Sequence, residues 1–173
     1  MSSEPPTDSS LKTILAEIEA LLKVGAKALE EGQHQEVVNT IGTLVQNELY
    51  VRRMIVKQGK QVTPELREVH GHYRDGRQSF LTSLISIICQ KYQVAVQNAR
   101  NGQTERGINI YQSSKKLLSW YRTEVMRGVR SEPDDEWRAW VEEELETIFQ
   151  MAFEEEVAAL QQLITIEVVR VRS

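Results

Sequence analysis

Cysteine, proline and glycine are scarce in this chain of 173 residues, which has one cysteine, four prolines and nine glycines. A single cysteine excludes an intrachain disulfide framework. Cys89 ends the apolar run from Phe80, so we expect it to be a small core residue in a reducing, cytoplasmic setting. The shortage of glycine and proline favours long helices over many turns.

Long apolar runs are also missing. No stretch reaches the roughly 18 apolar residues that a membrane span needs. The first ten residues, MSSEPPTDSS, lack the apolar core of a signal peptide. We therefore expect a soluble protein that begins with a disordered arm over residues 1–10. The length suits one domain, with or without an appendage.

Apolar residues instead recur at helical spacing. Leu11, Ile14, Leu15, Ile18 and Leu22 follow one another every three or four residues, as on one face of a helix. The same spacing predicts helices over about 11–31, 35–57, 64–101, 104–130 and 133–163. The tail over 164–171 is rich in β-branched residues and partly alternates, so we predict it to be helical with a short extended strand as the alternative.

The predicted fold is all-α, a bundle of about five antiparallel helices arranged as stacked helical hairpins. Residues 11–130 are expected to form the bundle. Residues 131–173 are expected to form an acidic, aromatic helix and tail that pack on the bundle or extend from it. The pair Gly-Gln occurs at 32–33 and again at 102–103, each between two predicted helices. This spacing is typical of helical hairpins and weakly suggests an internal repeat.

Charge is unevenly distributed along the chain. From Glu132 to Glu156 nearly every charged residue is acidic, whereas the preceding predicted helix is basic. The acidic helix either packs beside the basic one or binds a basic partner. The basic helix is a candidate phosphate-binding stripe for nucleic acid, with the residues Arg100, Arg106, Lys115, Lys116, Arg122, Arg127 and Arg130. A smaller basic patch contains Arg67, Tyr73, Arg74 and Arg77.

The large aromatic residues gather in the last third of the chain. They are Trp120, Tyr121, Trp137, Trp140, Phe149 and Phe153. The simpler interpretation is a core between the last two helices. The alternative is an anchor surface for a protein partner, because tryptophan and tyrosine dominate binding hot spots.

Patterns that would indicate catalysis are absent from the sequence. The only Glu-x-x-His pair, Glu31 with His34, straddles the predicted helix end at Gly32 and cannot share one helical face. Cys89 has no base near it in sequence, and no phosphate-binding glycine loop or zinc spacing occurs. We expect a protein that is not an enzyme and has no cofactor or metal.

The segment from Leu15 to Ser114 has Ala28-Leu29 before the Gly32-Gln33 joint, then an amphipathic helix, then Asn101-Gly102-Gln103 followed by Ile110-Tyr111. In this pattern it resembles the small flagellar export chaperones of the T/N type. The resemblance implies a helical fold whose C-terminal helices hold a secreted subunit on an apolar face. The chain differs in continuing for about sixty residues beyond Tyr111.

The leading functional hypothesis is a non-catalytic adaptor or export-chaperone-like protein. It would bind a helix of a protein partner along an apolar groove. Two alternatives stay open: a nucleic-acid-associated factor that uses the basic stripe of residues 100–130, and a self-assembling helical structural protein that forms a homodimer. No membrane interaction is expected.

Overall fold

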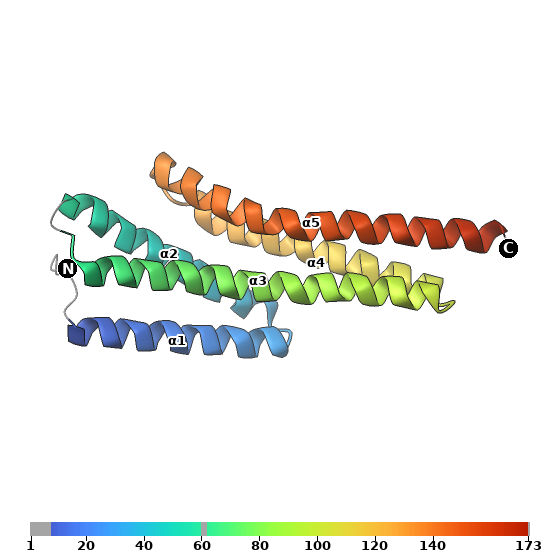
Figure 1. Cartoon of the computed structure of the whole chain (residues 1–173), viewed down its shortest axis with the longest axis horizontal. Coiled ribbons are helices and arrows are strands. Elements are labelled where there is room, and N and C mark those ends of the chain that lie inside the picture. Colours follow the sequence, from blue (N-terminus) through green and yellow to red (C-terminus); the bar gives the residue numbers. More distant parts are fainter. Residues whose placement is uncertain (1–7, 60–61, 173) are drawn as a thin grey trace. The chain divides into compact units, whose positions relative to one another are not determined.

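The computed structural model describes residues 8–59 and 62–172 (Figure 1). These residues form five helices and no strand: α1 (Asp8–Glu30), α2 (His34–Gln58), α3 (Pro64–Arg100), α4 (Thr104–Arg130) and α5 (Asp135–Arg172). The prediction of an all-α fold of five helices is confirmed. Among the described residues, no helix is both long enough and apolar enough to cross a membrane.

The helix bounds differ from the predicted ones in two places. Helix α1 begins at Asp8, so the last three residues of the predicted arm are helical, while residues 1–7 lie outside the described part. Helix α5 continues to Arg172, which makes the tail over 164–171 helical and the strand alternative wrong.

The chain divides into two compact units, residues 1–81 and 82–173. The boundary lies inside α3, whose first half belongs to one unit and whose second half belongs to the other. It therefore does not coincide with residue 131, where the composition changes.

In the first unit, α1 and α2 form an antiparallel hairpin (Figure 1). Its buried residues include Ile18, Leu44 and Val51, which cluster with residues of α3 such as Leu66 and Tyr73. Gly25 allows a close approach here. A Cβ atom at this position would lie only 2.7 Å from Cγ2 of Thr40 and 2.8 Å from Cζ of Phe80. The small residue thus lets the three helical segments share one core.

In the second unit, α4 and α5 pack side by side in antiparallel directions (Figure 1). A close approach between α3 and α4 depends on Gly107, where a Cβ atom would lie 2.5 Å from the backbone oxygen of Ala95. The core of this unit is built from helical faces at three- and four-residue spacing, with the buried residues Ile88, Tyr92, Leu118, Tyr121, Val125, Val141, Leu145 and Phe149.

The two Gly-Gln joints have the same backbone hydrogen bonds. The N–H of Gln33 donates to the carbonyl of Ala28, and that of Gly32 donates to Leu29. The second joint repeats this pattern, with Gln103 donating to Asn98 and Gly102 donating to Ala99. Both glycines have positive φ, 72° and 86°. This geometry is the Schellman motif, which satisfies the last carbonyls of a helix and favours glycine.

Side chains cap the starts of α3 and α5. The N–H of Leu66 donates to the hydroxyl of Thr63 at 3.3 Å, so Thr63 caps α3 in the motif Thr63-Pro64-Glu65, in which proline takes the first helical position. In the same way, the N–H groups of Glu136 and Trp137 donate to Oδ1 of Asp134. The start of α5 is therefore defined by a local hydrogen-bonding pattern.

Candidate protein-interaction surface

Basic residues of α4 face acidic residues of α5. Because the two helices are antiparallel, residues late in α4 pair with residues early in α5. Three ion pairs cross between the helices: Arg130–Glu142 at 3.4 Å, Arg122–Glu146 at 2.7 Å and Lys115–Glu156 at 3.8 Å. In these pairs the acidic helix lies beside the basic one and compensates part of its charge.

The other cations of the predicted phosphate-binding stripe are exposed. Arg127 pairs with Glu124 of the same helix at 3.1 Å, and Arg100 donates to the side-chain oxygen of Gln162 at 2.7 Å. Arg106 and Lys116 have no ion pair with the rest of the described chain. Exposed ion pairs contribute at most about 1 kcal/mol each, so these contacts set charge distribution more than stability.

The aromatic group lies largely in the core of the second unit. Tyr121 and Phe149 are completely buried, and Trp137 is nearly so. Trp120 packs edge-on against Tyr121 with ring centroids 5.0 Å apart. Side chains that form a core are not available as anchors for a partner unless the unit opens. Among the predicted anchor residues, only Trp120, Trp140 and Phe153 keep partly exposed surface.

The smaller basic patch is split by the fold. Arg77 is completely buried and donates from Nε and Nη2 to the carboxylate of Glu48, at 2.6 and 3.0 Å. Tyr73 is also buried, whereas Arg67 is exposed. This buried ion pair was not predicted from the sequence. A signal existed, because Glu48 follows Val37, Ile41 and Leu44 at helical spacing on the apolar face of α2.

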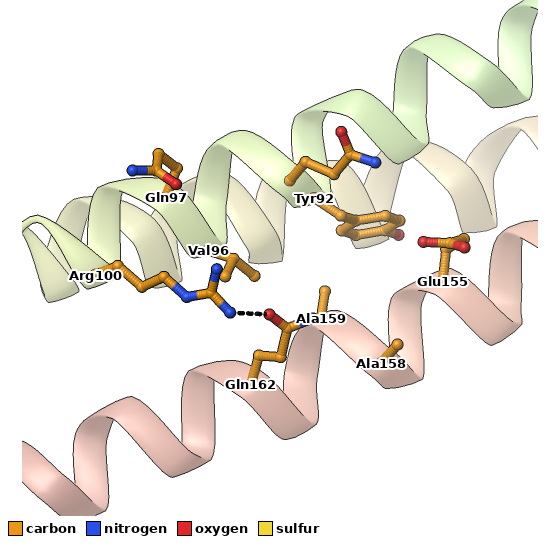
Figure 2. Close-up of a pocket in the computed structure, with 9 residues that line it drawn as sticks. Tyr92, Val96, Gln97, Arg100, Glu155, Ala158, Ala159 and Gln162 are labelled. Atoms are coloured by element: carbon orange, nitrogen blue, oxygen red, sulfur yellow. Dashed lines mark hydrogen bonds between the residues drawn. The ribbon is translucent and has the colours of Figure 1, made fainter.

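A small pocket lies between α3 and α5 in the second unit (Figure 2). Val96 and Ala159 form its apolar part. Arg100 closes one end through its hydrogen bond to Gln162, and Tyr92 lies toward the other end, beside Glu155 (Figure 2). No third polar group converges on Arg100 in this view. The pocket is therefore a gap bridged by one hydrogen bond rather than a built ligand site.

Next to this pocket, two buried tyrosines share a polar cluster with Glu156. The rings of Tyr92 and Tyr111 have centroids 5.7 Å apart. Burial and the nearby carboxylate of Glu156 raise the pKa of both phenols. Glu156 lies near Tyr111, but neither phenol hydroxyl makes a hydrogen bond of good geometry with the described residues. These two hydroxyl groups lower the free energy of unfolding, since buried hydroxyl groups are normally paired.

We expect Tyr92→Phe to stabilise the protein by about 1 kcal/mol at neutral pH, because it removes a buried hydroxyl without a partner. Because burial raises the pKa of Tyr92, the folded chain resists ionisation of this phenol: the ionisation costs no stability below about pH 10, the usual tyrosine value, and stability is lost as the pH rises further. The variant should therefore also lose less stability above pH 10. Urea unfolding at pH 7 and 10.5 measures both effects.

Tyr50 is exposed, so Tyr50→Phe serves as the control for that measurement. It should change the free energy of unfolding by no more than about 0.5 kcal/mol at either pH. A loss of stability at neutral pH in Tyr92→Phe would show that the hydroxyl has a favourable partner.

The second half of α5 presents an exposed apolar stripe. Its side chains are 37% to 75% exposed and follow one another every three or four residues: Val157, Leu160, Ile164, Val168 and Val171. We call these five residues the α5 stripe. A continuous exposed apolar face of this kind is unusual, because protein surfaces generally scatter such residues. The sequence predicts a helix and tail for this segment but does not distinguish its exposed face from its buried one.

The end of α5 also lacks packing. Leu163 is its last buried residue, and none of the residues 164–172 is buried. Figure 1 shows that the helix continues past the turn joining α3 to α4. Six of these nine residues are β-branched, a composition with low intrinsic helix propensity. Packing against another helix would stabilise this segment more than propensity does.

Metal-ligating side chains do not gather in the described part of the chain. It contains no cluster of three or more His, Cys, Asp or Glu side chains placed to hold a metal ion. Cys89 is half-buried, and burial together with Glu155 raises the pKa of its thiol. A thiol held in its protonated form is a weak nucleophile.

Comparison of the chain with protein-family models, curated proteins and solved structures gives no match.

Proposed function

We propose that this chain is a non-catalytic adaptor or chaperone-like protein of the cytoplasm, which binds an amphipathic helix of a protein partner along the α5 stripe. The observation that carries the proposal is the unpacked apolar face of α5. The proposed partner-binding surface is therefore the α5 stripe and not the aromatic group.

The shape of the stripe indicates a helical partner. From Val157 to Val171 it extends along one helix for about 21 Å, at 1.5 Å per residue. A narrow, straight line of β-branched and leucine side chains suits knobs-into-holes packing against a second helix. It suits a strand or a compact small molecule less well, because a strand needs a free sheet edge and a small ligand needs a concave site.

Two charges specify what the partner must carry. Glu154 and Arg172 are exposed, are eighteen residues apart and therefore lie on the same line of the helix, five turns of 3.6 residues apart. Neither forms an ion pair within the described residues. The partner helix should offer a basic residue opposite Glu154 and an acidic residue opposite Arg172, which gives pairing a direction.

The nucleic-acid alternative is less favoured by the contacts of α4. Phosphate binding requires cations that are free to meet the backbone. Lys115, Arg122 and Arg130 instead face carboxylates of α5.

The test is binding of a designed helical peptide of about twenty residues with a leucine and isoleucine stripe, basic residues at one end and acidic residues at the other. With dilute labelled protein, we expect saturable binding and a gain of helical circular dichroism by the peptide. Ile164→Lys should abolish binding. Val94→Lys changes an equally exposed apolar residue of α3 and should leave binding unchanged. Equal binding by both variants, or no binding by the unaltered protein, would refute the proposal.

A further inference from the structure

We infer that the helix bound by the α5 stripe is the α5 stripe of a second copy of this chain, in the antiparallel orientation. This inference rests on the proposed function and names the partner. Its basis is that α5 itself meets every requirement placed on that partner: an exposed apolar line of the same length, an acidic residue at one end and a basic residue at the other.

Antiparallel pairing brings complementary charges together. The midpoint between Glu154 and Arg172 is residue 163, and the midpoint of the α5 stripe, from Val157 to Val171, lies within one residue of it. A two-fold axis at this point sets Glu154 of each copy opposite Arg172 of the other. The parallel arrangement instead sets like charges opposite each other at both ends, which is unfavourable.

The apolar residues also match in this register. A two-fold axis between residues 162 and 163, within one residue of the midpoint of the charged pair, sets Leu160 beside Ile164 and Val157 beside Val168, each contact occurring twice. Phe153, which is partly exposed beneath the guanidinium of Arg122, then falls opposite Val171 at each end. Apolar side chains thus occupy each layer from one end of the pairing to the other.

The buried face of α5 is not needed for this contact. Leu163, Ala159 and Glu156 face the core of their own unit, about 100° or more around the helix from the line of Val157 and Ile164. Each copy therefore keeps its own core intact. Since the contact is a single helix pair, it lies at the small end of specific interfaces, and we expect a dimer that dissociates at roughly micromolar concentration.

Sedimentation equilibrium on the full chain tests the inference. We expect a monomer–dimer equilibrium, and Ile164→Lys should raise its dissociation constant at least about 30-fold, because the lysine enters the centre of the stripe in both copies. Val94→Lys should leave the constant unchanged. A dimer that tolerates Ile164→Lys would overturn the inference, as would a chain that stays monomeric at hundreds of micromolar.

Charge reversal tests the orientation. At low salt, Glu154→Lys and Arg172→Glu should each weaken the dimer by about threefold to tenfold, and the double variant should recover the original affinity. Parallel pairing predicts no change in any of the three. A spin label at Gln150, in a Cys89→Ala background, adds a distance: about 40 Å between copies in the antiparallel dimer and about 10 Å in a parallel one.

The experiments distinguish self-association from the adaptor function. A chain that is monomeric, yet binds the designed peptide in a manner that depends on Ile164, refutes self-association and keeps the adaptor function with a different partner. A chain that neither dimerises nor binds the peptide refutes both.

Discussion

Arg77→Met is expected to lower the free energy of unfolding by about 3–5 kcal/mol. The substitution leaves the carboxylate of Glu48, whose side chain is completely buried, without the guanidinium that binds it through two hydrogen bonds. An uncompensated buried charge is among the most destabilising changes known for a folded domain. Glu48→Leu should cost a similar amount for the reciprocal reason. Urea unfolding followed by far-ultraviolet circular dichroism measures the loss.

The double variant Glu48→Leu, Arg77→Met is the informative control. Two apolar side chains of similar volume remove both charges together, so the stability should return to within about 1 kcal/mol of the original or exceed it. Double variants that remain as unstable as the single ones would mean that the pair is held in place by a wider polar network.

The same variants report on the coupling between the two units. All three tryptophans, Trp120, Trp137 and Trp140, belong to the second unit, whereas Glu48 and Arg77 belong to the first. If the units unfold together, tryptophan fluorescence and circular dichroism should shift to the same lower urea midpoint. If they unfold separately, only the circular dichroism should move.

Phe149→Ala is expected to destabilise the protein by about 3–5 kcal/mol, since the ring is completely buried in the second unit and its removal leaves a cavity. Met151→Ala, two residues away on the exposed side of the same helix, should change stability by no more than about 0.5 kcal/mol. Urea unfolding followed by tryptophan fluorescence measures both.

This pair of variants also separates the two roles considered for the aromatic group. A core residue changes stability and leaves binding of the designed peptide intact under conditions where the variant is folded. A stable Phe149→Ala variant that no longer bound the peptide would instead identify Phe149 as part of the partner surface.

The positions of the helices were predictable from the sequence because their determinants are local. The spacing of apolar residues marks each helix, and Gly32 and Gly102 mark the two joints because a positive φ favours glycine. Thr63-Pro64-Glu65 likewise marks the start of α3. The tail over 164–171 was ambiguous, since its β-branched residues favour a strand while its position at the end of an amphipathic helix favours continuation.

The candidate site was less predictable, because amphipathic spacing shows that a helix has an apolar face but not what covers that face. The sequence by itself determined an all-α chain of five helices, two glycine joints and a basic helix followed by an acidic one. Only the tertiary structure decided that Arg77 is buried on Glu48, that Tyr121 and Phe149 face inward, and that the five side chains of the α5 stripe are exposed. Burial depends on contacts between residues far apart in the chain, and those contacts are set by packing rather than by local pattern.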